Sequence, residues 1–190
     1  VALWQGKGKL SIVLSAIAAA KMPHSENSPP PAPAPLRLAL FQPDIAQNAG
    51  TIIRMAACFG LPVSIIEPAG FPVSDRAFRR AGMDYLDAAT IDRHVNFTQF
   101  NAWRQTLGVR LILATTRASV PHTAFAWRAG DIILFGRESL GAPDEVHAAA
   151  DARIRIPMRP TLRSLNIAMS AAILAGEALR QLDAFPKETP

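Results

Sequence analysis

Short runs of apolar residues alternate along most of the chain with segments in which apolar residues recur every three or four positions. The apolar runs predict strands at residues 36–41, 62–67, 85–91, 109–115, 131–135 and 152–156. The segments of helical period predict helices at residues 48–59, 75–81, 97–107 and 164–182. Strands that are apolar throughout are buried on both faces, as in parallel sheets. The pattern therefore predicts an α/β fold with a mostly parallel sheet flanked by helices.

The first predicted helix carries signals at both ends. Asn48 is a suitable N-cap, and Gly60 is a suitable residue just beyond the carboxyl end. Cys58 lies within the apolar pattern of this helix and is expected to be a small buried hydrophobe. Because it is the only cysteine, no disulfide forms within the chain. A reducing, cytoplasmic location fits that composition.

The last predicted helix is apolar on nearly every side. Small residues recur along it, including Ala168, Ala172 and Gly176, and larger residues such as Ile173 fill the positions between them. A helix of this kind needs burial over most of its surface. It is either the core helix of a monomer or a helix that also packs against a second subunit. Its breadth favours the second interpretation, a homodimer.

Residues 1–35 differ in composition from the rest of the chain. Prolines crowd the second half of this stretch, which predicts a disordered, extended tail in front of a single domain at 36–186. An apolar run at 10–20 follows Lys7 and Lys9, as in a signal peptide. That run is too short to span a bilayer, and the body resembles a cytosolic enzyme, so no membrane association is expected.

The basic residues of the body are all arginine. The net charge is +5, and between Leu36 and Pro186 every Lys or Arg position holds Arg. Arginine grips phosphate with two parallel donors, which suits an RNA backbone, although a GC-rich genome would favour the same residue. The histidines and Cys58 do not stand at the spacing of metal ligands, so no metal site is expected.

Three loops follow predicted strands at the positions where ligands bind in open α/β sheets, at residues 114–116, 135–141 and 156–166. Gly136 and Gly141 would allow the backbone of the second loop to approach a ligand closely. Ala142 and Pro143 stand where a phosphate-binding loop would need Lys and Ser or Thr. The chain also lacks a serine nucleophile elbow and a glycine-rich dinucleotide turn, which disfavours ordinary hydrolases and dinucleotide enzymes.

The same loops carry a family resemblance. Residues 48–54 (NAGTIIR) resemble the first motif of the SPOUT methyltransferases, 135–141 the second, and 154–158 with 163–166 the third. Residues 41–45, 66–68 and 79–85 are also similar to the tRNA wobble-nucleotide (cytidine/uridine) 2′-O-methyltransferases. The resemblance extends over residues 36–183. It implies an α/β fold with a trefoil knot in the carboxyl part, S-adenosylmethionine as cofactor, a homodimer, and the anticodon stem-loop of tRNA as substrate.

The resemblance also implies functional residues. Those expected at the cofactor are Ala114, Thr115, Gly136, Ile156, Met158, Ser164, Leu165 and Asn166. Those expected to contact RNA are Arg76, Arg79, Arg80, Arg159 and Arg163, with a plain solvated helix face as the alternative for the first three. Leu140 and Leu162 depart from the family, which often has a basic and a polar residue there, and Arg137 is expected to replace the basic one.

The expected reaction is attack of a ribose 2′-oxygen on the methyl carbon of a sulfonium, which needs alignment of the two groups but no metal. Asn48, Arg54 and Glu138 are the expected catalytic residues. Arg54 would orient the neighbouring phosphate and stabilise charge on the 2′-oxygen, and Glu138 would fix the second loop or pair with an arginine.

Two alternatives remain open at this point. One is a ribosomal RNA 2′-O-methyltransferase of the same superfamily, and the other is a non-catalytic RNA-binding protein. A pure binder has no need of a cofactor cleft, and a compact body without a separate RNA-binding domain favours a small substrate. Cytidine and modified uridine are both possible wobble substrates.

Overall fold

The computed structural model describes residues 34–72, 76–82 and 85–187. They form a seven-stranded sheet with the order β3-β2-β1-β6-β4-β7-β5, in which all neighbouring strands are parallel. The strands are β1 (Leu36–Phe41), β2 (Val63–Ile66), β3 (Ile91–His94), β4 (Leu111–Ala114), β5 (Val120–Pro121), β6 (Asp131–Phe135) and β7 (Ala152–Arg155). The prediction of an α/β fold with a parallel sheet is confirmed.

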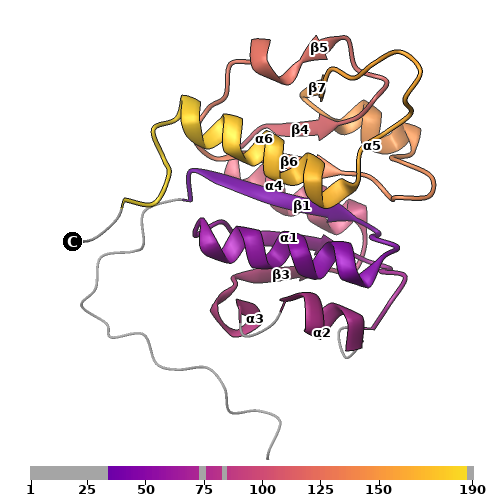
Figure 1. Cartoon of the computed structure of the whole chain (residues 1–190), viewed down its shortest axis with the longest axis vertical. Helices are drawn as coiled ribbons and strands as arrows, with labels where there is room; N and C mark the ends of the chain where they lie inside the picture. The colour runs from indigo at the N-terminus through magenta and orange to yellow at the C-terminus, as the bar shows by residue number, and fades with distance from the viewer. Residues whose placement is uncertain (1–33, 73–75, 83–84, 188–190) are drawn as a thin grey trace, which may run out of the picture. The chain divides into compact units, whose positions relative to one another are not determined.

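Helices cover both faces of the sheet. They are α1 (Ala46–Cys58), α2 (Arg76–Gly82), α3 (Tyr85–Ala88), α4 (Phe97–Leu107), α5 (Asp144–Ala149) and α6 (Ile167–Gln181), with a 3₁₀ turn η1 (His122–Ala124). Figure 1 shows α1 and α6 on one face of the sheet, with α4 behind it.

The alternation of side chains along β1 explains this layering. Leu36, Leu38 and Leu40 point into a core shared with α1 and α6. Ala39 and Phe41 point into a second core shared with α4 and α5. Successive residues of a strand face opposite sides of a sheet, so a strand that is apolar at every position serves two cores at once.

The structure corrects the prediction of a strand at 85–91. Residues Tyr85–Ala88 form α3, and the strand comes later, at Ile91–His94. Leu86 packs against the core from this short helix. A short apolar run fits a buried strand and a buried turn of helix equally well, so its period does not separate them. Strand β5 and helix α5 had no prediction, because they are only two and six residues long and show no clear period.

The first helix also differs from expectation. Its N-cap is Ile45, so Asn48 lies within the first turn and Cys58 is the last residue. Gly60 has a φ of +66°, as expected beyond a helix end. Cys58 is exposed, and its predicted burial was wrong. The buried face of α1 includes Ala49, Ile52, Ile53 and Ala56, a stripe that Cys58 lies outside.

The tail predicted at 1–35 falls almost entirely outside the described residues and stays a prediction. In the part of the chain that the structure describes, no helix is long and apolar enough to cross a membrane.

Candidate functional site

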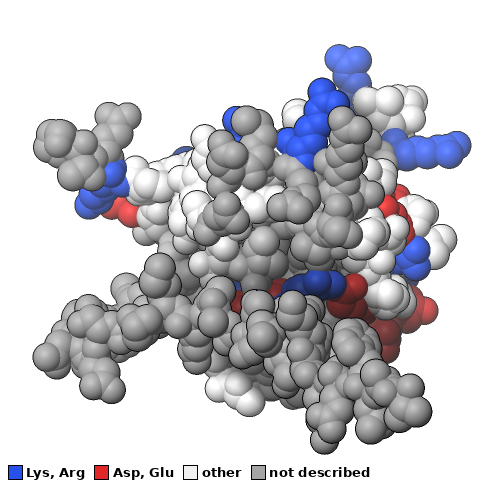
Figure 2. Space-filling view, turned by 90° about the horizontal axis from the view of Figure 1, so that it is seen from below, with Lys and Arg blue, Asp and Glu red and all other residues white. Residues whose placement is uncertain are grey.

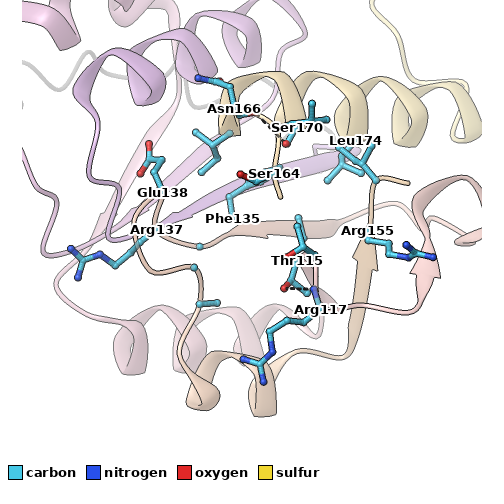
Figure 3. Close-up of a pocket in the computed structure, with 18 of the residues that line it drawn as sticks. Thr115, Arg117, Phe135, Arg137, Glu138, Arg155, Ser164, Asn166, Ser170 and Leu174 are labelled. Carbon is cyan, nitrogen blue, oxygen red and sulfur yellow. Dashed lines mark hydrogen bonds between the residues drawn. The ribbon is translucent and has the colours of Figure 1, made fainter. Parts of the chain in front are cut away.

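A cavity of about 590 Å³ opens at the carboxyl edge of the sheet. The segments that follow β1, β4, β6 and β7 line it, together with the first turns of α6 (Figure 3). The sheet extends from β1 toward β3 in one direction and from β6 toward β5 in the other. The cavity therefore lies at a topological switch point, where open α/β sheets bind ligands.

The loop after β6 is a tight turn. Arg137 N–H donates to Gly141 O at 2.9 Å, and Gly141 N–H donates to Arg137 O at 2.8 Å. Gly141 has a φ of +70°, a backbone conformation that favours glycine. The turn folds back so closely that a Cβ on Gly136 would lie 2.5 Å from Gly141 C. Two glycines thus allow this loop to form one wall of the cavity.

Polar side chains connect this loop to two other walls. Glu138 Oε1 accepts from Asn48 Nδ2 at 3.2 Å, and Asn48 Oδ1 accepts from Asn166 Nδ2 at 3.0 Å. Asn166 is also the N-cap of α6, because its Oδ1 accepts from Ala168 N–H at 2.8 Å. The end of the cavity near Glu138 and Asn166 is therefore a continuous hydrogen-bonded network.

Asp44 holds the outer side of the same loop. Its Oδ1 accepts from Arg137 Nη2 at 2.6 Å and its Oδ2 from Ser139 Oγ at 2.5 Å. The hydrogen bond from Arg137 is the main cause that lowers the pKa of Asp44 to about 2, from a usual 3.8. Asp44 is therefore ionised throughout the neutral range. Arg137 is occupied by this ion pair, which argues against the expectation that it replaces a basic residue at position 140.

The opposite end of the cavity carries positive charge. Arg117 and Arg155 line it there (Figure 3). His147 also lines it, and burial, followed by the charge of Arg117, lowers the pKa of this imidazole. The imidazole is therefore neutral at pH 7, and the positive charge comes from the arginines. That end suits a carboxylate or a phosphate.

All of the residues expected at the cofactor line the cavity. They are Ala114, Thr115, Gly136, Ile156, Met158, Ser164, Leu165 and Asn166. Asn48 and Glu138, two of the three expected catalytic residues, also line it. The structure therefore brings together residues that are more than a hundred positions apart in the sequence, such as Asn48 and Asn166.

Arg54 is not among the residues that line this cavity. It lies exposed on α1, and its guanidinium carbon is 5.1 Å from the centroid of the Tyr85 ring. Three of the arginines expected to contact RNA, Arg80, Arg159 and Arg163, also lie outside the cavity lining. Arg80, Arg159 and Arg163 are exposed, whereas the side chains of Arg76 and Arg79 lie outside what the structure describes.

Many other arginines stabilise the fold. Ion pairs join Arg37 to Asp92 at 2.5 Å, Arg104 to Asp151 at 2.7 Å, and Arg110 to Asp131 at 2.6 Å. Figure 2 shows further Lys and Arg side chains that stand out from the surface at the upper right of the view. The arginine content of the body thus has two uses, partly buried ion pairs and exposed positive charge.

Sequence reasoning missed several residues of the cavity, among them Ile45, Arg117, His147 and Leu174. Asp44, which holds the loop from outside, was also missed as a functional residue. A signal existed for Arg117, which stands directly after the first predicted loop. His147 lies on α5, an element that the sequence pattern did not predict.

The chemistry of the cavity fits S-adenosylmethionine. Its volume is in the range of sites for small cofactors. Apolar residues such as Ile154, Ile156 and Leu174 can cover an adenine ring, and Arg117 and Arg155 suit the carboxylate of the methionine part. Among residues 34–72, 76–82 and 85–187, no group of His, Cys, Asp and Glu side chains is arranged to hold a metal ion.

Fold and cavity together define an α/β protein with a cavity of cofactor size between loops at the carboxyl edge of a parallel sheet. Residues 35–176 match the SpoU rRNA Methylase family. The chain belongs to this family, and the resemblance to SPOUT methyltransferases is confirmed.

Individual relatives agree with the family match. The chain is 61% identical over 150 residues to a protein of Beijerinckia indica subsp. indica named tRNA (cytidine(34)-2′-O)-methyltransferase, covering 79% of this chain and 94% of the relative. It is similar to a solved structure described as giving insights into the 2-OH methylation of C/U34 on tRNA, with a TM-score of 0.75, 39% identity, and coverage of 78% and 96%. An AdoMet-bound rRNA methyltransferase from Sinorhizobium meliloti has a TM-score of 0.73 at 28% identity, with coverage of 78% of this chain and 59% of that one.

Proposed function

We propose that the chain transfers a methyl group from S-adenosylmethionine to the ribose 2′-hydroxyl of the wobble nucleotide of tRNA, a cytidine or a modified uridine. The observation that carries the proposal is the cavity in which every residue expected at the cofactor converges. The 61% identity to a relative named for this reaction supports the substrate.

Bound S-adenosylmethionine would supply an activated methyl group, so the protein's task is alignment. In the transfer, the 2′-oxygen forms a bond to the methyl carbon, the carbon–sulfur bond breaks, S-adenosylhomocysteine leaves, and the hydroxyl proton is released. Glu138 has both carboxylate oxygens occupied, by Asp44 N–H at 2.8 Å and by Asn48 Nδ2. This favours a role for Glu138 in fixing the loop rather than as a general base.

Arg54 is proposed to bind the RNA phosphate next to the reacting ribose. It lies outside the cavity of its own chain, on a helix that packs beside α6 (Figure 1). A second copy that docks on α6 and also covers the exposed face of α1 would contact Arg54. Arg54 of one subunit would then serve the cavity of the other. Arg80, Arg159 and Arg163 are proposed to extend the phosphate contacts, together with Arg76 and Arg79.

The proposed homodimer uses the exposed side of α6. Met169 is 59% exposed and Ile173 is 37% exposed, and Leu165, just before the helix, is 41% exposed. These residues recur at helical spacing and form an apolar strip that begins at the mouth of the cavity. An apolar strip of this kind on a helix is typical of a subunit interface.

The dimer prediction uses the double variant Met169→Glu/Ile173→Glu. The parent chain is expected to have twice its monomer mass of 20.4 kDa in light scattering. The double variant is expected to have the monomer mass, because the two carboxylates would lose their hydration in the interface. Leu107→Glu is the matched control, since Leu107 is 51% exposed on α4, on the other face of the sheet. A monomeric parent at micromolar concentration would contradict the proposal.

The trefoil knot and the domain limits belong to the same proposal. The knot is proposed because the resemblance to the SPOUT methyltransferases implies it, and it would involve the segment after β7, which lines the same cavity as the loops after β4 and β6. Residues 36–186 are proposed to form the methyltransferase domain, with 1–35 as a Pro-rich extension.

The substrate is tested by supplying labelled S-adenosylmethionine with total tRNA and with ribosomal RNA in parallel reactions. Label is expected in the tRNA fraction only. Label in ribosomal RNA alone would favour the alternative function, a ribosomal RNA 2′-O-methyltransferase of the same superfamily. Binding of tRNA without any transfer of label would favour a non-catalytic RNA-binding protein.

A further inference from the structure

A single residue outside the cavity lining, Asp44, contacts three consecutive residues of the cavity loop through its carboxylate and its backbone N–H. Asp44 Oδ1 accepts from Arg137 Nε at 3.1 Å and from Arg137 Nη2 at 2.6 Å. Its Oδ2 accepts from Ser139 N–H at 3.1 Å and from Ser139 Oγ at 2.5 Å. The backbone N–H of Asp44 donates to Glu138 Oε2 at 2.8 Å. All these contacts join residues more than ninety positions apart in the sequence.

The loop that Asp44 holds has few other restraints at its tip. The hydrogen bonds between Arg137 and Gly141 close its base. Leu140 at the tip is 76% exposed, so no apolar packing fixes it. The restraints on residues 137–139 therefore come mainly from Asp44 and, through Glu138, from Asn48.

Movement of this loop would disturb the hydrogen bonds that join Glu138, Asn48 and Asn166. Glu138 orients the side-chain amide of Asn48, and Asn48 in turn accepts from Asn166, the N-cap of α6. Figure 3 shows Glu138 and Asn166 at the same end of the cavity. A loop that loses Asp44 would release Glu138 and, with it, the polar network at that end.

We propose that Asp44 is a positioning residue for methyl transfer, which acts by holding Arg137, Glu138 and Ser139 so that the loop at 136–141 is fixed before the cofactor binds. The proposal rests on the proposed function, because it assigns the cavity to the methyl donor. A loop that is already ordered loses less conformational entropy on binding, so cofactor affinity is the property that depends most on Asp44.

The ion pair between Asp44 and Arg137 is present over the whole pH range in which a methylation assay is run. The Arg137 guanidinium lowers the pKa of Asp44 to about 2. A carboxylate with a lowered pKa contributes stability above its unfolded pKa, and that contribution is lost as the pH falls toward about 2. Between pH 6 and pH 9, roughly, the effect of removing Asp44 should therefore not change with pH.

The test compares Asp44→Asn, Arg137→Gln and the double variant with the parent protein. An amide at position 44 can keep an acceptor toward Arg137, but its NH₂ group would then face Ser139 N–H, which is also a donor. Each single variant is expected to raise the cofactor KM about tenfold, with the RNA KM unchanged. The double variant is expected to be no worse than Asp44→Asn, because Asp44→Asn already removes the ion pair with Arg137 as well as an acceptor for Ser139.

Glu67→Gln is the matched control. Glu67 also accepts from an arginine, Arg93, and from a backbone N–H, that of Ala69 at 2.7 Å. It does not line the cavity. This variant is expected to keep the parental KM for both substrates. Ser139→Ala removes one contact of the loop and is expected to raise the cofactor KM only about twofold.

The readouts separate positioning from a purely structural role. A structural defect would lower the melting temperature and the fraction of active protein while the cofactor KM stays unchanged. That result, or a parental KM in Asp44→Asn, would overturn the proposal. The affinity for S-adenosylhomocysteine, measured by calorimetry, tests the same loop without turnover. If the parent binds it but methylates no RNA, the proposed function fails, and the effect of Asp44 on affinity is still measured.

Discussion

Gly136→Val is expected to abolish cofactor binding. A Cβ at this position would lie 2.5 Å from Gly141 C, 2.6 Å from Ala142 N and 2.9 Å from Gly141 O. All three are backbone atoms of the same loop, so the turn that forms the cavity wall has to open. We expect the Kd for S-adenosylhomocysteine to rise at least about a hundredfold, or ~2.8 kcal/mol.

Calorimetry with S-adenosylhomocysteine measures this loss of affinity. The titration is repeated in EDTA, which should leave the affinity of the parent unchanged because binding is expected to need no metal. Gly141→Ala is the matched control in the same loop. A Cβ there meets nothing within 4 Å, and only its φ of +70° opposes the change. Gly141→Ala should therefore weaken the binding of S-adenosylhomocysteine less than Gly136→Val does, by about 1 kcal/mol. If Gly136→Val bound the cofactor as the parent does, Gly136 would not belong to the site.

Arg54→Ala is expected to lower the rate of methyl transfer about a hundredfold, the usual effect of losing one preorganised charged donor. The buried face of α1 consists of Ala49, Gly50, Ile52, Ile53 and Ala56, so folding should be preserved. Cofactor affinity should also be preserved, because Arg54 does not line the cavity.

The measurement is single-turnover methylation of a saturating anticodon stem-loop, with the melting temperature and cofactor affinity determined on the same samples. Tyr85→Leu removes the ring beside Arg54 and controls for that contact. Mixed dimers of Arg54→Ala and Gly136→Val chains test the proposed action between subunits. Each mixed dimer should recover one active site, which is half of the activity of a parental dimer, if Arg54 acts across the interface, and none if Arg54 acts within its own chain. A parental rate in Arg54→Ala would make Arg54 an ordinary surface residue.

The sequence was sufficient for the parts of the fold and site that depend on local pattern. The runs at 36–41 and 131–135 are apolar at nearly every position, and both are strands buried on two faces. The meeting of the loops at 114–116, 135–141 and 156–166 could be predicted because these loops follow parallel strands, which end at one edge of the sheet. Their convergence is then a consequence of the fold class. The individual residues expected at the cofactor came from the family resemblance.

The partners of those residues could not be predicted in the same way. Asp44 and Arg137 meet only because β6 pairs with β1, although the residues of β6 follow those of β1 by more than ninety positions. Strand order depends on tertiary packing and not on local period. The exposure of Cys58 could not be predicted for the same reason. Which face of α1 packs against the core depends on tertiary packing, and Cys58 lies outside that face.

The most direct test of the account compares two synthetic anticodon stem-loops that differ only at nucleotide 34. One carries a ribose 2′-hydroxyl there, and the other carries a 2′-deoxyribose. With labelled S-adenosylmethionine and the full chain, we expect one methyl group per molecule on the first, mapped by mass spectrometry to the ribose of nucleotide 34, and none on the second. Equal labelling of both stem-loops, or a methyl group on a base, would contradict the assignment of this cavity to wobble 2′-O-methylation.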